Sequence, residues 1–377
     1  MKRFFALFCL FSLVLCVPAR AVELDLNAPS AILMEKATGT VLYAKDEHTP
    51  REPASVTKIM TILLTMEAID GGLLSYDDVV TGSAHASSMG GSQIWLKEGE
   101  QMTVRDLLKA VCVVSGNDAA VALGEQLAGS ETAFVEKMNA RAAQLGMTDT
   151  HFVNATGLPA AGHVTSAHDI AVMSRELILH HPDVRQFTTI WMDSLRDGAS
   201  MLVNTNKLIR FYDGATGLKT GSTDAAGYCL SATAERGGME LIAVVMKGST
   251  SDERFADARA MLDYGFATYT LATIAPDAAL APLPVVLGER NAVQPVLTPD
   301  NTLLLEKSAA GGLQKEVVLP DAVNAPVERG DRLGELRVTG ADGGTVAVLP
   351  ILAGESVAHV TWGQMFRRLV KAGFCGE

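Results

Sequence analysis

Cysteine is scarce in this 377-residue sequence, and its spacing excludes several kinds of site. Two of the five cysteines lie in the apolar N-terminal stretch, and the other three are Cys112, Cys229 and Cys375. These three are too widely spaced for a structural zinc site and too few for a disulfide framework. We expect free and mostly buried thiols, although one disulfide among the three is compatible with the sequence.

Charged residues are also few, and basic residues are outnumbered. Asp, Glu, Lys and Arg make up 20% of the chain against 48% hydrophobic residues, which excludes an intrinsically disordered protein. The formal net charge is −12. Such an acidic protein lacks the positive surface that nucleic acids require, so no nucleic-acid partner is expected.

The longest apolar run lies near the N-terminus. Two basic residues precede the apolar stretch Phe4–Val17, and Ala19-Arg20-Ala21 has the small-x-small pattern of a cleavage site. This pattern predicts a signal peptide over residues 1–21 and an exported protein. A lipoprotein signal built on Cys16 is disfavoured, because Leu15 stands where a small residue is required.

The remainder of the chain is too long for one ordinary core and predicts two domains. Residues 22–270 mix strand and helix patterns, so we expect an α+β domain there. Its predicted strands are 31–35, 40–44 and 241–246, and its predicted helices are 56–69, 104–114, 118–127 and 257–264.

A change of composition near Leu271 predicts a second, small all-β domain over residues 271–352. An Ala- and Pro-rich linker is followed by short β-leaning segments separated by Gly, Pro, Asn and Asp. These segments are 283–288, 302–306, 315–319, 333–338 and 344–349.

The terminal stretch, residues 353–377, has the pattern of an amphipathic helix. Its apolar side chains recur at steps of three and four, and arginine, lysine and glutamine occupy the other face. A basic face opposite an aromatic-rich apolar face predicts a helix that lies on a membrane surface. A helix that docks on its own protein is the alternative.

Three short motifs appear in a fixed order with domain-scale gaps. They are Ser55-Val-Thr-Lys58, which is S-x-x-K, Ser115-Gly116-Asn117, which is S-x-N, and Lys219-Thr220-Gly221, which is K-T-G. Each alone is weak, since Ser and Asn commonly cap helices and Lys-Thr-Gly is common in surface turns. Their joint occurrence in this order is specific for acyl-serine chemistry.

The first motif pairs a nucleophile with a base. Serine attacks a carbonyl only when a neighbouring base removes its proton. With Ser55 at the start of a helix, Lys58 lies one turn along on the same face. Burial, the positive end of the helix and a second cation, Lys219, all disfavour the charged form of Lys58. Ser115 is then the hydroxyl that passes a proton to the leaving amine, with Asn117 orienting substrate and Lys58.

With these motifs the sequence resembles the low-molecular-mass penicillin-binding proteins that are D-alanyl-D-alanine carboxypeptidases. The resemblance runs from about Ala31 to the terminal helix and includes Met89-Gly-Gly-Ser-Gln, Thr103-Val-Arg-Asp-Leu-Leu108, Gly157-Leu158 and Thr223-Asp-Ala-Ala-Gly-Tyr228. It implies a serine β-lactamase/transpeptidase-like domain, with an antiparallel sheet that has helices on both faces.

The resemblance also implies roles for single residues. Ser55 is then the acylated nucleophile, Lys58 the base, and Ser115 the proton relay with Asn117. The K-T-G residues Lys219, Thr220 and Gly221 form the substrate-binding edge strand. The backbone N–H groups of Ser55 and Ser222 form the oxyanion hole.

One arginine and one departure complete this comparison with the family. Arg254 stands where the family places an arginine, and with Thr220 it is expected to hold the free carboxylate of the substrate. Many relatives have histidine after K-T-G, where this chain has Ser222. The backbone N–H survives that change, whereas substrate preference and pH response are open.

The expected substrates are peptidoglycan stem peptides ending in D-Ala-D-Ala, with β-lactams as covalent inhibitors and no cofactor or metal. The expected location is the periplasm, at the outer face of the cytoplasmic membrane, with the terminal helix as peripheral attachment. An endopeptidase with the same residues remains an alternative, and so does a non-catalytic wall-binding protein.

Two other enzyme classes are weaker alternatives. A β-lactamase with S-D-N needs a glutamate in E-x-x-L-N between S-x-N and K-T-G, and the one match, residues 23–27, lies before Ser55. A metallopeptidase would draw on His163, His168, Asp169, His180 and His181, which lack H-E-x-x-H or similar spacing.

Overall fold

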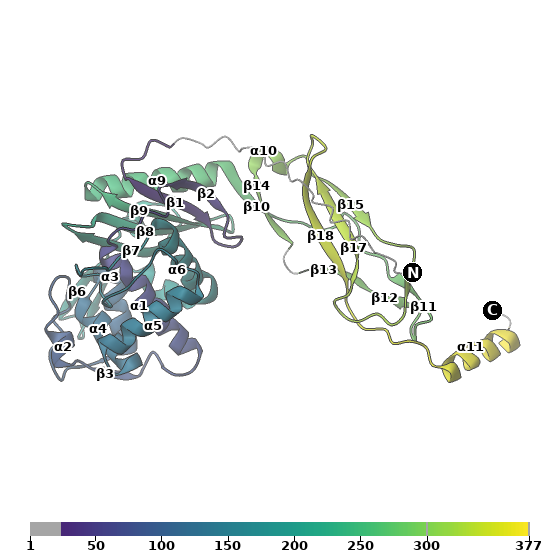
Figure 1. Ribbon diagram of the computed structural model, residues 1–377, viewed down its shortest axis with the longest axis horizontal. Helices are drawn as coiled ribbons and strands as arrows, with labels where there is room; N and C mark the ends of the chain where they lie inside the picture. The colour runs from purple at the N-terminus through teal and green to yellow at the C-terminus, as the bar shows by residue number, and fades with distance from the viewer. Residues whose placement is uncertain (1–23, 299–300, 376–377) are drawn as a thin grey trace, which may run out of the picture.

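The computed structural model describes residues 24–298 and 301–375. The predicted signal peptide, residues 1–21, lies outside the described residues. Two bodies follow one another along the chain, and the terminal helix lies beyond the second (Figure 1).

The first body contains a five-stranded antiparallel sheet with the strand order β2-β1-β9-β8-β7. The strands are β1 (Ser30–Glu35), β2 (Val41–Lys45), β7 (Ala215–Thr223), β8 (Gly227–Arg236) and β9 (Met239–Gly248). The expected pairing of the first two strands is confirmed, and the predicted 241–246 strand is the middle of β9. In this order β7, which carries K-T-G, lies at one edge of the sheet.

Helices cover both faces of this sheet because its strands are apolar on both sides. Leu241, Ala243 and Val245 of β9 pack in one core with α9 (Ser251–Thr268). The alternate residues Ile242 and Val244 face a larger core on the other side. A strand buried on both faces reads as a continuous apolar run, as the sequence of β9 does.

The larger core contains most of the helices. These are α1 (Lys58–Asp70), α3 (Val104–Val114), α4 (Asn117–Ala128), α5 (Glu131–Gln144) and α6 (Ala167–His180). The 104–114 prediction matches α3 at both ends, and 118–127 falls within α4. The predicted 56–69 helix is a 3-10 turn, Ala54–Thr57, followed by α1. Helices α5 and α6 were not predicted, and α9 begins six residues before the predicted 257.

Short strand pairs complete the first body. They are β3 (Val79–Thr81) with β4 (Gln101–Thr103), and β5 (Met192–Leu195) with β6 (Ser200–Val203). The short helices are α2 (Ala84–Ser87), η2 (Pro182–Val184), α7 (Arg185–Thr188) and α8 (Leu208–Phe211).

The second body is mainly β-structure, as the sequence predicts. It holds the sheets β13-β18-β17-β15 and β12-β11-β16 with two small cores. The strands are β11 (Leu283–Val286), β12 (Ala292–Val293), β13 (Pro295–Leu297), β15 (Gln314–Val318), β16 (Val323–Asn324), β17 (Arg332–Thr339) and β18 (Thr345–Ala353).

A further strand pair joins the two bodies. Strand β10 (Tyr269–Thr273) directly follows α9 and pairs with β14 (Thr302–Glu306), which leads into α10 (Lys307–Ala310). The expected boundary between residues 270 and 271 therefore falls inside β10. The amine of Lys307 donates to the carbonyl of Phe266 in α9, 2.6 Å away, which adds a contact across this junction.

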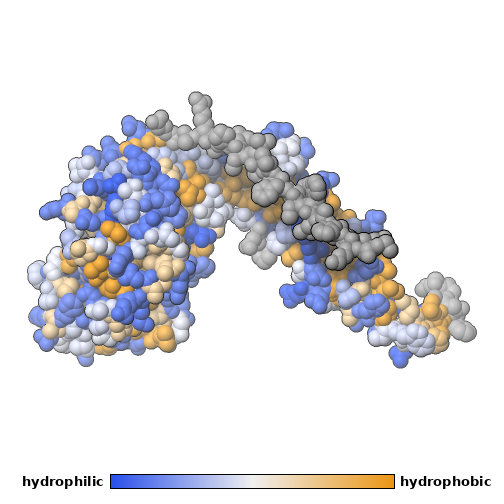
Figure 2. Space-filling model, viewed as in Figure 1, coloured by the Kyte–Doolittle hydropathy of each residue, from blue (hydrophilic) through white to orange (hydrophobic). Residues whose placement is uncertain are grey.

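The last described element is α11 (Trp362–Cys375). Its apolar residues include Trp362, Phe366 and Leu369, which are 81%, 54% and 65% exposed. Figure 2 shows apolar surface on this helix at the right-hand end of the molecule. Within the described ranges, every helix is too short or too polar to pass through a bilayer. Cys112 and Cys229 are buried free thiols, as expected.

Candidate active site

The S-x-x-K motif places a buried lysine directly beside the serine. Ala54, before the serine, has a left-handed φ of 49°, and the 3-10 turn from Ala54 leads into α1. The Nζ atom of Lys58 lies 2.9 Å from Oγ of Ser55 and donates at 2.8 Å to the carbonyl of Thr156. Lys58 is fully buried. Two hydrogen bonds, to Oγ of Ser55 and to the carbonyl of Thr156, therefore hold the Lys58 amine in place.

The environment of Lys58 favours its neutral form. Burial is the main cause that holds the pKa of its ammonium well below the ordinary value, and the charge of Lys219 acts in the same direction. Asp118 opposes this shift without reversing it. The pKa of Lys219 is itself lowered to about 7, mainly by burial. A neutral amine within hydrogen-bond reach of a serine hydroxyl can accept its proton.

The S-x-N motif lies at the junction of α3 and α4. Ser115 ends α3 in the left-handed conformation, with φ of 63°, and Asn117 begins α4. The side-chain amide of Asn117 donates to the carbonyl of Gly90 at 2.6 Å. Among the described residues nothing pairs with Oγ of Ser115 or Oδ1 of Asn117, although both are buried. Buried polar atoms without partners are rare, so these two atoms keep hydrogen-bonding capacity that the described residues do not use.

The K-T-G strand approaches the serine at Gly221. A Cβ atom on Gly221 would lie 2.8 Å from the backbone nitrogen of Ser55, so only glycine permits this approach. Lys219 is buried, and its amine donates to the carbonyl of Thr220 at 2.8 Å. Ser222, next along the strand, is exposed. The edge strand and the nucleophile are therefore in direct backbone contact.

Arg254 lies behind this strand. Its Nη1 donates to the carbonyls of Gly221, at 3.0 Å, and Cys229, at 3.3 Å. The guanidinium is buried between the rings of Tyr228 and Phe255. Its Nε is also buried and has no partner among the described residues. Arg254 therefore braces the K-T-G strand through main-chain oxygens, a contact that the sequence did not predict.

Thr205 is a residue of this region that sequence reasoning missed. Its hydroxyl bonds that of Thr220 at 2.7 Å, and its backbone N–H donates to the carbonyl of Val113 near the end of α3. It thus connects the strand of K-T-G with the helix that ends at Ser115. The sequence around it, Asn-Thr-Asn, carried no signal beyond that of a polar loop.

The loop at residues 154–158 holds the S-x-x-K segment from the other side. The carboxamide oxygen of Asn154 accepts from the backbone N–H groups of Thr156 and Gly157, which forms a tight turn. This turn presents the Thr156 carbonyl to Lys58. A Cβ atom on Gly157 would lie 1.8 Å from the carbonyl oxygen of Ala54, so the loop packs on the residue before the serine.

The residues of the metallopeptidase and β-lactamase alternatives do not come together as a site. His180 pairs with Glu176 and His181 with Asp70, whereas His163 is buried against Thr57. Asn27, in the string that matched E-x-x-L-N, bonds Asp257 of α9. No carboxylate is hydrogen-bonded to Ser55 or Lys58 in the part of the chain that the structure describes.

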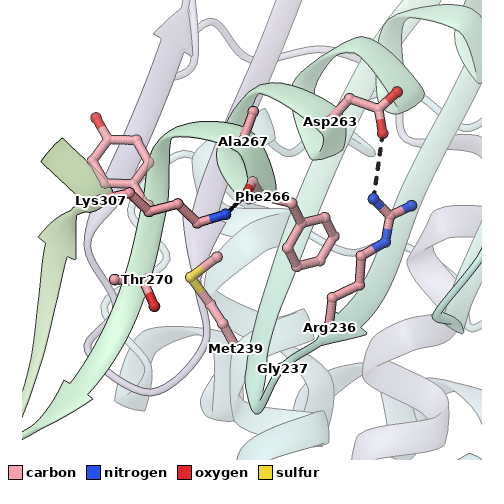
Figure 3. Close-up of a pocket in the computed structure, with 9 residues that line it drawn as sticks. Arg236, Gly237, Met239, Asp263, Phe266, Ala267, Thr270 and Lys307 are labelled. Carbon is pink, nitrogen blue, oxygen red and sulfur yellow. Dashed lines mark hydrogen bonds and ion pairs between the residues drawn. The ribbon is translucent and has the colours of Figure 1, made fainter. Parts of the chain in front are cut away.

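The predicted site residues do not line the cavity that Figure 3 shows. That cavity, of about 440 Å³, lies at the junction of the two bodies, between the β8–β9 turn, the end of α9 and Lys307. Arg236 and Asp263 face each other across one side of it. Most of the predicted site residues, among them Lys58, Asn117 and Lys219, are instead buried beside Ser55 and β7.

This fold and site define a class: serine enzymes of the penicillin-binding, transpeptidase-like fold. Residues 17–250 match the peptidase S11 family, described as D-alanyl-D-alanine carboxypeptidase, and residues 270–359 match the C-terminal domain of penicillin-binding protein 5. The chain belongs to the D-alanyl-D-alanine carboxypeptidase family and is a serine peptidase.

Individual relatives agree with this assignment. The chain is similar to D-alanyl-D-alanine carboxypeptidase DacF of Bacillus subtilis, with 43% identity over 90% of this chain and 88% of the relative. The structure of penicillin-binding protein 5 from Haemophilus influenzae aligns with a TM-score of 0.79 and 28% identity, over 90% of this chain and 100% of that one. Ampicillin-bound penicillin-binding protein D2 from Listeria monocytogenes aligns with a TM-score of 0.60 and 35% identity, over 65% and 99%.

The contact of Gly157 with Ala54 generates a stability prediction. Gly157→Ala adds a methyl group where only 1.8 Å separates it from the Ala54 carbonyl, at φ of 83°, so we expect a loss of about 3–5 kcal/mol in the free energy of unfolding. Gly162→Ala is the matched control, since its φ is 80° and its Cβ would meet no atom within 4 Å. The control should lose only about 1–2 kcal/mol. Equal losses in urea unfolding would show that the loop does not press on the nucleophile segment.

Proposed function

We propose that this protein removes the terminal D-alanine from peptidoglycan pentapeptide stems through an acyl-serine intermediate on Ser55. The observation that carries the proposal is the buried Lys58 amine, 2.9 Å from Oγ of Ser55, in surroundings that favour its neutral form. The family of D-alanyl-D-alanine carboxypeptidases supplies the substrate class.

The proposed reaction has two halves. Lys58 takes the proton of Ser55 while Oγ bonds the carbonyl carbon of the penultimate D-alanine. The peptide C–N bond then breaks, and the amine of the terminal D-alanine receives a proton through the hydroxyl of Ser115. In the second half, water attacks the ester, which releases the shortened stem and restores Ser55.

The substrate is proposed to extend along the free edge of β7, as an added strand. The oxyanion is received by the backbone N–H groups of Ser55 and Ser222, which does not require the histidine that many relatives have at position 222. Thr220, with its hydroxyl bonded to that of Thr205, receives the terminal carboxylate. Arg254, buried behind Gly221, adds positive charge to this end of the site.

β-Lactams are proposed to acylate the same serine and to remain bound as covalent inhibitors. The ampicillin-bound relative from Listeria monocytogenes supports this ligand class. The lack of a carboxylate bonded to Ser55 or Lys58, among the described residues, argues against the fast water activation of a β-lactamase.

We also propose how the chain is organised in the cell. Residues 1–21 are a signal peptide, 22–270 the peptidase domain, 271–352 the small β-domain and 353–377 the attachment segment. The exported protein is held in the periplasm at the outer face of the cytoplasmic membrane. Support comes from the exposed apolar side chains of α11, which are unusual on a free surface. Arg368 of this helix donates to the carbonyls of Gly288 and Glu289, so its basic side contacts the β-domain.

Replacement of the nucleophile tests the central proposal. Ser55→Ala should lower D-alanine release from a D-Ala-D-Ala pentapeptide by more than about 10⁴-fold without unfolding, because no other group can form the ester. Ser222→Ala, which keeps its backbone N–H, should stay within a few-fold of the wild type. Intact-mass analysis with benzylpenicillin should show one adduct, absent from Ser55→Ala. Persistent release by Ser55→Ala, or rapid nitrocefin turnover without D-alanine release, would contradict the assignment.

The charge of Lys219 generates a pH prediction. Because Lys219 lowers the pKa of Lys58, Lys219→Met should raise that pKa and move the acidic limb of the acylation-rate profile to higher pH. Acylation by benzylpenicillin is followed from acidic to mildly alkaline pH. The control is Lys137→Met, on the exposed surface of α5, which should leave the limb in place. If the acidic limb of Lys219→Met lies at the same pH as in the wild type, the charge of Lys219 does not contribute to the activation of Lys58.

Vesicle binding tests the role of α11. Removal of residues 360–377 should abolish sedimentation with anionic phospholipid vesicles and leave D-alanine release unchanged, because the site lies wholly in the first body. In the full chain, Phe366→Glu with Leu369→Glu should weaken sedimentation strongly. Leu73→Glu, at a residue that is 85% exposed in the first body, is the control. Sedimentation of the truncated protein at wild-type levels would rule out this attachment.

A further inference from the structure

A buried histidine outside the reaction scheme contacts the turn that carries the nucleophile. His163 is 2% exposed, and its Nε2 atom lies 2.8 Å from the hydroxyl oxygen of Thr57. Its other nitrogen, Nδ1, accepts from the backbone N–H of Val153 at 3.0 Å. Thr57 lies between Ser55 and Lys58 in the S-x-x-K motif and carries no role in the reaction.

The hydrogen bonds fix the proton positions in this network. The Thr57 hydroxyl has one proton, which it donates to the carbonyl of Ala54 at 2.8 Å. Nε2 of His163 must therefore be the donor to Thr57, and Nδ1, which accepts from Val153, must be unprotonated. The ring is neutral, which agrees with a pKa lowered to about 4 by burial and, secondarily, by His151.

The network ends on the residue that sets the direction of Ser55. Ala54 is held in the left-handed region, with φ of 49°, which non-glycine residues adopt only when their surroundings enforce it. The Thr57 hydroxyl bonds the Ala54 carbonyl, and Gly157 packs closely against the same oxygen. The peptide that follows Ala54 includes the backbone N–H of Ser55.

We propose that His163 is a positioning residue for acylation, acting through the Thr57 hydroxyl on the Ala54 carbonyl to fix the backbone N–H and Oγ of Ser55. This inference rests on the proposed acyl-serine function and adds a residue to it. The neutral ring donates and accepts in fixed directions, so it holds the 3-10 turn in one orientation. A shift of about 1 Å in a reacting atom can cost on the order of 10²-fold in rate, which makes this support kinetically significant.

Paired variants separate the hydrogen bonds from the shape of the side chains. Thr57→Val keeps the branched shape and loses the hydroxyl, whereas Thr57→Ser keeps the hydroxyl. His163→Leu loses both hydrogen bonds, whereas His163→Gln offers an amide N–H for Thr57 and an oxygen for Val153. The measured quantity is the second-order rate constant for acylation by benzylpenicillin, corrected for the folded fraction from thermal unfolding.

We expect Thr57→Val and His163→Leu to be acylated by benzylpenicillin about 10–100-fold more slowly than the wild type. The acylation rates of Thr57→Ser and His163→Gln should stay within a few-fold of the wild-type rate. The double variant Thr57→Val with His163→Leu should be no slower than the slower single variant, since both remove one chain of contacts. If His163→Leu does not fold, the comparison of Thr57→Val with Thr57→Ser carries the same test.

Wild-type acylation rates in folded Thr57→Val and His163→Leu would overturn the proposal and leave His163 a role in stability alone. Multiplied effects in the double variant would also overturn it, because independent contributions exclude a shared path. A wild-type protein that forms no adduct on Ser55 would instead refute the proposed function. The two failures are therefore distinguishable.

Discussion

The structure depends on one costly arrangement, a lysine amine kept inside the protein without a bonded carboxylate among the described residues. A buried ammonium is strongly disfavoured, and here burial and a second lysine together lower its pKa. The neutral amine still requires hydrogen-bond partners, which are Oγ of Ser55 and the carbonyl of Thr156. The same burial that disfavours the charged form of Lys58 thus suits it to the proposed role of a base for the serine.

Two segments distant in sequence contact that amine and its serine. The edge strand β7 approaches so closely that only Gly221 fits against the backbone of Ser55. The turn at Asn154 supplies the carbonyl for Lys58, whereas the participation of Ser115 and Asn117, at the junction of α3 and α4, remains a prediction. Arg254 braces β7 from behind through main-chain oxygens. Most of these contacts are made by backbone groups, so the geometry depends on the fold more than on single side chains.

Local patterns allowed much of the fold to be predicted, and long-range contacts account for what was missed. The ends of α3 follow from its apolar spacing and its Thr103 cap, and Lys58 follows from its three-residue spacing to Ser55. Helix α5 was missed because it is polar and has no strong apolar stripe. The start of α9 was placed too late because the helix begins after the Thr250 cap, before the apolar residues on which the prediction was based. The roles of Thr156 and Thr205 depend on chain segments far away, which no local pattern shows. Arg254 was expected to face the substrate, and that role remains a prediction, whereas its bonds to β7 became visible only in the structure.

The anchor of Lys58 on a main-chain oxygen has a consequence for how such a site is recognised. Every amino acid has a carbonyl group, so the bond to Lys58 does not itself require threonine at position 156. The Thr156 side chain is buried and bonds the carboxamide oxygen of Asn154, so its identity matters for the shape of the turn and not for the chemistry of the anchor. A search for catalytic residues by side-chain identity would overlook this contact.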